Sequence, residues 1–414
     1  MKLLTGDVVC SMIKTSRTKL ITTFGVIAAD GVVVNGLTML ADGQDIFTVL
    51  NASKCETILT SWKRPEFIFL QKFLKMGKSF PSSDLETVVP VECEQAPCLK
   101  QLIVYELSSH EDHTALLSSL EGEDFYQAHG SADDEAHIFL TSGSTSYSKM
   151  VLRTHRECLK FADTLDFNSD VFLNNREMEW MAAFPCAYLG SGATTIVQEY
   201  TDSSVKISLP DIWNIACDMG ATGAMLIPEE MMVVKQGFNR VTVWFNGRAY
   251  EGLKFESWVR VCRTSLSLQI PDGYLPYIPA DHTIPFDMLK DCYVGDRLLG
   301  SVQMKIVDEQ TNREVTGPNQ VGKLFLKGGM VLRHYMNADS TASGVITDDG
   351  WFDSSDVGYI DDVGGIHVIG RTSDTIISGP GVVYPQWLEE RIQKYPGVAS
   401  VAVVGTGFKL FLQM

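Results

Sequence analysis

Short apolar runs alternate with amphipathic stretches along most of the chain. The run VVCSMI (8–13) is typical of a strand, residues 15–29 carry apolar positions at helical spacing, and VVVNG (32–36) returns to a strand pattern. Strand, helix and strand in this order predict a parallel pair joined by a right-handed crossover. Similar β-rich runs between helical stretches are CETILTSW, EFIFLQKFL, HIFLTSGS, TTIVQEY, GATGAMLIP and VTVWFNG. The pattern predicts an α/β body with buried parallel strands.

The pattern changes after Asp291. The segments GSVQMKIVDEQTNREV, GKLFLKGG and GGIHVIG are short strand-like runs joined by turn residues, which predict an antiparallel, hairpin-rich module. A last unit follows, with a helix from about Pro385, a stop at Pro396-Gly397 and the strand-like run VASVAVVG. One helix and one or two strands bury too little surface to fold alone. This unit therefore either leans on the main body or is part of a truncated domain.

Size and charge narrow the class of protein. The chain has 414 residues, of which 45% are apolar and 21% are charged, so it is long enough for more than one hydrophobic core. The net charge of −17 argues against a nucleic-acid partner or an anionic membrane surface, because both require a basic footprint. The nine cysteines are scattered without zinc-like spacing, which favours reduced thiols in a cytosol-like compartment.

No transmembrane segment and no targeting signal is visible. The longest apolar stretch, 21–40, is interrupted by Asp30, Gly31 and Asn35 and is not expected to span a bilayer. The first residues, MKLLTGDVVC, do not form a signal peptide, and LFLQM carries no address signal. We expect an intracellular protein of the cytoplasm or the peroxisome.

A cluster of small hydroxyl side chains follows the apolar run HIFL. It contains Thr141, Ser142, Gly143, Ser144 and Thr145, and Lys149 comes shortly after it. A strand that ends in such a turn can direct N–H and O–H groups at a phosphate, and the lysine adds positive charge. The P-loop pattern of NTPases is absent. A loop that caps the next helix explains the same residues equally well.

A second cluster lies in GWFDSSDVG and GRTSD. The carboxylate of Asp356 can accept both hydroxyls of a ribose, and Arg371 can donate to a sugar or phosphate oxygen. The alternative is that Asp356 only ends a hairpin and Arg371 is a surface residue.

The two clusters together resemble the adenylate-forming superfamily, which includes acyl-CoA synthetases, 4-coumarate–CoA ligases, beetle luciferases and peptide-synthetase adenylation domains. LTSGSTSYSKMVLRTH is similar to the family's phosphate loop. The stretch from GWFDSSDVGYI to VASVAVVG is similar to the family segment that crosses between its two domains. The resemblance implies an α/β fold with an N-terminal domain over 1–372, which carries the antiparallel module, and an incomplete α+β C-terminal domain over 373–414.

The resemblance also implies a reaction and its residues. A substrate carboxylate attacks the α-phosphate of ATP, pyrophosphate leaves, and the thiol of CoA opens the acyl-adenylate; Mg²⁺ is the expected metal. Lys149 and Tyr188 are the implied catalytic residues, with Tyr188 beside the acyl carboxylate. The nucleotide would be held by Thr141–Thr145, Tyr274, Asp356 and Arg371.

Several positions depart from the family pattern. Ser146, Ser148 and Met150 replace Gly, Pro and Gly in the phosphate loop, and Ile278 stands where a magnesium-binding glutamate belongs. An isoleucine cannot ligate magnesium, so we expect Mg²⁺ to add little to ATP binding. The family's usual first segment and its C-terminal lysine are expected to be missing.

Three interpretations stay open at this point. The first is an AMP-forming acid–CoA ligase that acts on a small carboxylic acid. The second is a degenerate, non-catalytic relative that binds a nucleotide or acyl ligand or acts as an interaction scaffold, and the third is a fragment without a separate function.

Overall fold

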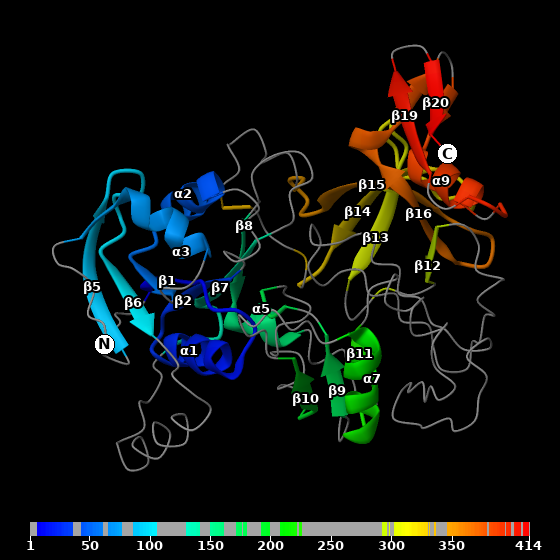
Figure 1. Ribbon diagram of the computed structural model, residues 1–414. Coiled ribbons are helices and arrows are strands. Elements are labelled where there is room, and N and C mark those ends of the chain that lie inside the picture. Colours follow the sequence, from blue (N-terminus) through cyan, green and yellow to red (C-terminus); the bar gives the residue numbers. More distant parts are fainter. Residues whose placement is uncertain are drawn as a thin grey trace. The chain divides into compact units, whose positions relative to one another are not determined.

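Figure 1 shows the computed structural model of the protein. The structure describes residues 6–35, 43–60, 65–76, 86–105, 130–140, 150–160, 171–175, 177–179, 192–198, 208–221, 223–225, 292–295, 298, 302–329, 331, 335–336, 346–378, 381–393, 395–398, 401–406 and 409–413. The chain forms two compact units. The first comprises 1–162, 171–207 and 334–340, and the second comprises 163–170, 208–333 and 341–414.

The first unit is built on an eight-stranded sheet in the order β4-β5-β6-β3-β1-β2-β7-β8. Its central strands are parallel and its outer pairs are antiparallel. The predicted parallel α/β body is thus confirmed, with antiparallel edges added. The elements of the first unit are β1 (Val8–Ser11), α1 (Arg17–Ala28), β2 (Val32–Asn35), α2 (Gly43–Ala52), β3 (Thr57–Thr60), α3 (Pro65–Leu70), β4 (Leu74–Met76), β5 (Glu86–Cys93), β6 (Gln101–Tyr105), β7 (Glu135–Leu140), β8 (Met150–Thr154), α5 (His155–Lys160), β9 (Val171–Asn174) and β10 (Thr194–Val197).

Alternate residues of the central strands face opposite layers of helix. Cys10 and Val34 lie in one core with Leu50 of α2, whereas Val9 and Val33 lie in another core with Val26 of α1. Figure 1 shows α1 and α2 on opposite faces of the sheet. This alternation follows from the two-residue period of a strand. Both faces of the sheet are therefore covered, which explains why its strands are continuous apolar runs.

The segment EFIFLQKFL is helical, so its prediction as a β-rich run was wrong. It forms most of α3 and a 3₁₀ turn over Gln71–Phe73, and only its last residue, Leu74, belongs to a strand, β4. Phe69 and Phe73 are four residues apart, and their ring centroids lie 6.1 and 5.0 Å from that of Phe47 on α2. Contacts at this spacing require a helix, because residues four apart share one helix face. Aromatic packing against α2 overrides the β propensity of the phenylalanines.

A buried ion pair joins α1 to the segment 177–179. Lys19 Nζ lies 3.4 Å from Glu179 Oε1, and the two side chains are 0% and 1% exposed. Thr15 Oγ1 accepts a hydrogen bond from the Met178 amide at 2.8 Å and lies 3.5 Å from Glu179 Oε2. The pair anchors a segment that is distant in sequence onto the first α-helix.

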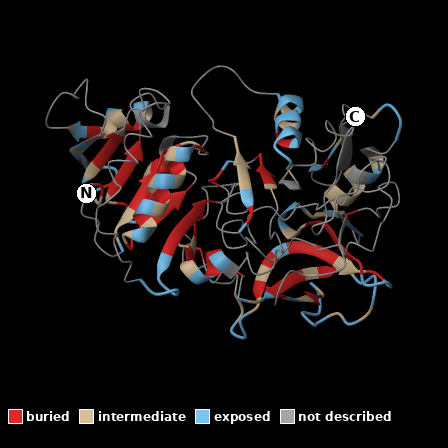
Figure 2. Ribbon diagram, turned by 90° about the horizontal axis from the view of Figure 1, so that it is seen from below, coloured by how far each residue is buried: buried red, intermediate tan, exposed pale blue. Residues whose placement is uncertain are grey.

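The second unit contains a five-stranded sheet in the order β12-β16-β15-β14-β13, in which all neighbours are antiparallel. This confirms the predicted hairpin-rich module after Asp291. The elements of the unit are α7 (Leu209–Asp218), β11 (Gly223–Met225), β12 (Tyr293–Gly295), β13 (Gln303–Val307), β14 (Gly322–Lys327), β15 (Phe352–Ile360), β16 (Ile366–Arg371), β17 (Ile376–Ser378), β18 (Gly381–Val383), α9 (Pro385–Gln393), β19 (Ala402–Thr406) and β20 (Lys409–Gln413). Figure 2 shows buried residues in red along the strands of this sheet.

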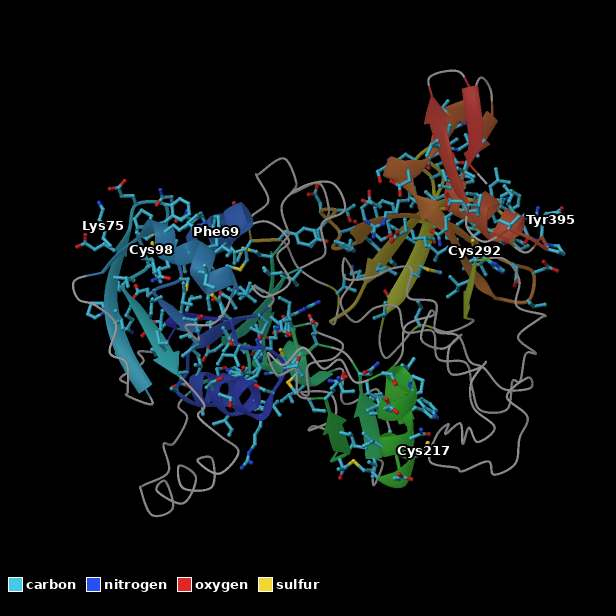
Figure 3. The ribbon with its side chains drawn as sticks, viewed as in Figure 1. Phe69, Lys75, Cys98, Cys217, Cys292 and Tyr395 are labelled. Carbon is cyan, nitrogen blue, oxygen red and sulfur yellow. The ribbon has the colours of Figure 1, made fainter. Side chains whose placement is uncertain are left out.

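The helix expected from Pro385 packs against this antiparallel sheet. Tyr384 and Trp387 contact a core formed by Cys292, Val357 and Ile369. Cys292 is labelled in Figure 3. These contacts pack the start of the last unit on the antiparallel module. The two alternatives, that the unit leans on the main body or is part of a truncated domain, stay predictions. The domain boundary between residues 372 and 373 stays a prediction. Within the described residues, no helix is both long enough and apolar enough to cross a bilayer.

We predict that Glu179→Gln destabilises the first unit, because it leaves the Lys19 ammonium buried without its carboxylate. The loss is about 3 kcal/mol, in line with the removal of one partner from a buried pair. A urea unfolding curve measures it. The double variant Lys19→Met with Glu179→Leu is the control, since removing both charges restores most of the midpoint. Equal urea midpoints for Glu179→Gln and the wild type would show that the ion pair does not contribute to stability in this way.

Candidate functional site

Asp356 and Arg371 face each other across neighbouring strands. They are register partners on β15 and β16, and Arg371 Nε lies 3.8 Å from Asp356 Oδ1. That separation is an ion pair rather than a hydrogen bond. The Asp356 side chain is 3% exposed and that of Arg371 is 24% exposed. The structure therefore brings together the two residues that were predicted to hold a ribose.

This pairing depends on a shift of register within the hairpin. Near the turn, Ile360 pairs with Ile366, and counting along both strands from there would set Asp356 opposite Gly370. The register moves by one residue between Val357 and Gly358, and Asp356 consequently faces Arg371 instead. Such a bulge redirects side chains and is common beside functional sites.

Two glycines permit the shift. A Cβ on Gly358 would lie 2.2 Å from the His367 carbonyl oxygen, so only glycine allows the strands to approach this closely. Gly370 has a φ of +155°, a conformation that residues with a Cβ rarely adopt. The bulge is thus encoded by DVG in β15 and by VIGR in β16.

Burial sets the charge state of Asp356. Removal from water raises the pKa of its carboxyl from 3.8 to about 7, against the lowering effects of the Arg371 charge and the Ser354 hydroxyl. The nearby carboxylates of Asp353 and Asp374 add to the increase. An upward shift of the pKa means that the protein holds this carboxyl in its interior at a cost in stability. A buried carboxyl with a shifted pKa beside a cation is a candidate for function.

The strand around Asp356 is held in an unusual conformation. Ser355 has a φ of +61°, and its amide donates to Asp353 Oδ1 at 2.8 Å. The Ser354 hydroxyl donates to the Leu324 carbonyl at 2.9 Å and accepts from the Asp356 amide at 3.1 Å. A left-handed residue that is not glycine stores strain, which concentrates at functional sites. These contacts fix the backbone on the N-terminal side of the carboxylate.

The supporting roles of Asp353 and Ser354 were not predicted from the sequence. The two-residue period of a strand provides a partial signal, because it puts Ser354 on the same face as Asp356. No local sequence pattern predicts the positive φ of Ser355.

The other predicted site residues lie outside the part of the chain that the structure describes. They are Thr141, Ser142, Gly143, Ser144, Thr145, Lys149, Tyr188 and Tyr274. The structure does describe both ends of the hydroxyl-rich loop, where Leu140 of β7 pairs with Met150 of β8. The loop 141–149 therefore connects two antiparallel strands that are buried at their junction with it.

The next helix has a cap among the described residues, and the alternative that the loop itself acts as a cap stays a prediction. The helix after the loop is α5, and its N-terminus is capped by Thr154, whose Oγ1 accepts from the Glu157 amide at 3.3 Å. Glu157 Oε2 in turn accepts from the Thr154 amide at 3.1 Å, which completes a capping box. The hydroxyl groups of the loop are not required for that purpose.

No metal centre can be assigned from the described residues. Among them, no group of three or more His, Cys, Asp or Glu side chains is arranged to hold an ion. The position of Ile278, on which the expectation for Mg²⁺ depends, lies outside the described ranges. That expectation stays a prediction.

Comparison with known families identifies the family of the chain. The family described as AMP-binding enzyme matches residues 2–262. That match covers more than half of the 414 residues, and the chain belongs to this family. The resemblance stated from the two clusters is thus confirmed.

Similar proteins include several CoA ligases. Peroxisomal OPC-8:0-CoA ligase 1 of Arabidopsis thaliana is 25% identical over 297 residues, which cover 66% of this chain and 52% of the relative. The 2-succinylbenzoate–CoA ligase of Oceanobacillus iheyensis is 22% identical over 80% of this chain and 68% of its own length. The chain spans about half the length of the first of these.

Solved structures of the same fold cover nearly the whole chain. O-succinylbenzoate coenzyme A synthetase (MenE) from Bacillus subtilis, solved with ATP and magnesium, matches 98% of this chain and 78% of its own, with a TM-score of 0.69 and 19% identity. ATP-bound MatB from Rhodopseudomonas palustris matches 97% and 76%, with a TM-score of 0.66 and 20% identity. At such identities the likeness shows the fold, and it confirms the predicted α/β class.

We predict that Asp356→Asn removes a pH dependence of stability. The folded-state pKa of about 7 lies above the ordinary value of 3.8, so the folded protein keeps a proton that the unfolded chain has released. The contribution of Asp356 to the free energy of unfolding is therefore greatest below about pH 4. It falls as the pH rises towards 7 and is lowest above that pH. The Asn variant lacks this decline and gains on the order of 2–4 kcal/mol at pH 8.

Thermal unfolding between pH 4 and pH 8 measures this effect. Asp348→Asn is the matched control, because Asp348 is exposed in the turn before β15. Parallel melting curves for Asp356→Asn and the wild type across that range would contradict the assignment of a high pKa to Asp356.

Proposed function

We propose that the protein is an ATP-dependent acid–CoA ligase. It converts a carboxylic acid and ATP into an acyl-adenylate and pyrophosphate, and then transfers the acyl group to coenzyme A with release of AMP. The observation that carries the proposal is the buried carboxylate of Asp356, held opposite Arg371 in a member of the AMP-binding enzyme family. The names of the similar CoA ligases support the choice of reaction.

Asp356 binds the ribose of the nucleotide in this proposal. Its two oxygens accept hydrogen bonds from the two sugar hydroxyls, and the guanidinium of Arg371 stabilises the negative charge of the Asp356 carboxylate. Because burial raises the pKa of Asp356 to about 7, the free site is partly protonated at neutral pH. Ribose hydroxyls favour the ionised carboxylate, so nucleotide binding releases a proton, and affinity rises as the pH increases through 7.

The hydroxyl-rich loop and Lys149 hold the phosphates. Thr141, Ser142, Gly143, Ser144 and Thr145 direct donors at the phosphate oxygens, and the lysine stabilises the charge that collects on the departing pyrophosphate. Support for this assignment comes from the pairing of Leu140 with Met150, which presents the loop at the end of two buried strands. Tyr188 lies beside the reacting carboxylate, and Tyr274 contacts the adenine.

The bonds that change define the two half-reactions. In the first, a carboxylate oxygen forms a bond to the α-phosphorus of ATP, and the bond from that phosphorus to the pyrophosphate oxygen breaks. In the second, the thiol of coenzyme A gives up its proton to solvent, its sulfur forms a bond to the acyl carbon, and AMP leaves with the electron pair of the cleaved carbon–oxygen bond. Mg²⁺ accompanies ATP as its counterion in this proposal, and no step is assigned to it.

The remaining features of the proposal follow the family. The boundary between the larger and the mobile smaller domain is placed after residue 372. The substrate is a small carboxylic acid whose class we leave open. The protein acts inside the cell, in the cytoplasm or the peroxisome, and the peroxisomal name of one similar ligase supports the second compartment. No observation on the described residues favours the non-catalytic or fragment interpretation.

Asp356→Ala is expected to weaken ATP binding about tenfold or more. The change removes one or two charge-assisted hydrogen bonds, each worth roughly 1.5–3 kcal/mol. Calorimetric titration of the 414-residue protein measures the dissociation constant, and Asp348→Ala is the control on the exposed turn. An unchanged dissociation constant in Asp356→Ala would rule out the ribose assignment, and an absence of binding in the wild type would overturn the proposed function.

Lys149→Ala is expected to slow the first half-reaction. We predict a decrease of about 10²-fold in the acid-dependent exchange of labelled pyrophosphate into ATP, because one donor to the leaving phosphates is lost. Lys72→Ala, which changes an exposed lysine of the same unit, leaves the exchange unaffected. Equal rates of pyrophosphate exchange in the two variants would show that Lys149 is not a catalytic residue.

A further inference from the structure

A short segment that lies between β14 and β15 in the sequence is part of the first unit. Residues 334–340 belong to that unit, whereas 208–333 and 341–414 belong to the second. The structure describes Tyr335 and Met336 of this segment. Tyr335 is buried, and Met336 packs against the core that contains Leu140 and Met150. The first unit thus includes a piece of chain whose sequence neighbours on both sides belong to the second.

Tyr335 and Met336 contact the outer edge of β8. This strand is the last in the order of the eight-stranded sheet, and β7 is its neighbour on the inner side. Tyr335 forms an antiparallel bridge with Val151, and the Met336 amide donates a hydrogen bond to the Met150 carbonyl at 3.0 Å. An edge strand presents main-chain N–H and C=O groups that require partners. The two residues supply such partners at the start of β8.

The carbonyl of Met150 points away from β7. In an antiparallel pair, successive residues direct their main-chain polar groups alternately towards the partner strand and away from it. Met150 is the register partner of Leu140 on the inner side, and its carbonyl bonds to Met336 on the outer side. The hydrogen bond that holds this carbonyl is therefore supplied by Met336 and not by β7.

The position of these contacts along β8 suggests a role beyond covering an edge. The strand runs from Met150 to Thr154, and Lys149 immediately precedes its first residue. A segment that only covered the edge could bond anywhere along the strand. Among the described residues, its contacts fall on Met150 and Val151, at the end that joins the hydroxyl-rich loop. They restrain the main chain next to Lys149.

We propose that Met336 is a positioning residue for Lys149. Its amide holds the Met150 carbonyl, fixes the start of β8 and so directs the preceding lysine towards the phosphates of ATP. When this hydrogen bond is lost, the main chain at Met150 turns more freely, and the ammonium is placed less accurately against the leaving pyrophosphate. A misplacement of about 1 Å can slow a reaction by about 10²-fold. The inference rests on the proposed function for the role of Lys149.

The first test requires neither ATP nor activity. Met336→Pro removes the N–H group that donates to Met150, and Met336→Leu keeps that group and an apolar side chain of similar size. In the ligand-free protein, amide hydrogen exchange over residues 150–152 is expected to become about tenfold faster in the proline variant and to stay unchanged in the leucine variant. Strand β1 is the reference, because β2 and β7 separate it from β8, and its exchange is expected to stay at the wild-type rate.

A second variant guards against a general disturbance by proline. The amide between residues 335 and 336 is replaced by an ester, through incorporation of the α-hydroxy acid analogue of methionine at position 336. The ester lacks the N–H group and keeps the side chain, so it is expected to reproduce the faster exchange of β8. The inference is overturned if the proline and ester variants both leave residues 150–152 at the wild-type rate, or if exchange in β1 rises equally.

The second test is a double-mutant cycle in the acid-dependent exchange of pyrophosphate into ATP. Met336→Pro is expected to lower kcat about tenfold in the wild-type background, with little change in the KM for ATP, and less than about twofold in Lys149→Ala, because it acts through the lysine. Met336→Leu is expected to match its parent in both backgrounds.

Equal reductions of kcat by Met336→Pro in the two backgrounds would contradict the inference. A wild-type protein without any pyrophosphate exchange would instead overturn the proposed function, and with it the role given to Lys149. The hydrogen-exchange result distinguishes the two failures, because it reports on the bond between Met336 and Met150 without any substrate.

Discussion

A single shift of register in the β15–β16 hairpin determines what the candidate site can do. With a continuous register, the carboxylate of Asp356 would face Gly370, and Arg371 would lie opposite Ser355 instead. The shift is permitted by Gly358, whose missing side chain leaves room for the backbone of the neighbouring strand. The chemistry assigned to the site therefore depends first on backbone geometry and only then on the two charged side chains.

Function and stability are opposed at this position. Burial raises the pKa of Asp356, and Arg371 lies too far away, at 3.8 Å, for a hydrogen bond. The positive φ of Ser355 adds strain next to it. A hairpin selected for stability alone would place an apolar residue here. Apolar contacts from Tyr384 and Trp387 to Val357 and Ile369 support these two strands in the conventional way.

Periodicity in the sequence was sufficient for most of the fold. It identified the first strand, helix and strand, the antiparallel module and the helix from Pro385, because each has a clear apolar period. It failed for residues 66–73, where phenylalanines that favour strands pack in helical turns on α2. The motifs identified Asp356 and Arg371 as candidate site residues. The bulge that pairs them, and the contact of Asp361 with His367, depend on how two strands are aligned, and the sequence alone does not give that alignment.

The most direct measurement of the central claim is an experimental structure of the protein with a non-hydrolysable ATP analogue. The account predicts that both ribose hydroxyls lie within about 3 Å of the Asp356 carboxylate, that Arg371 remains opposite it, and that the register shift at Gly358 is retained. A ribose bound away from β15, or a hairpin of continuous register with Asp356 opposite Gly370, would contradict it.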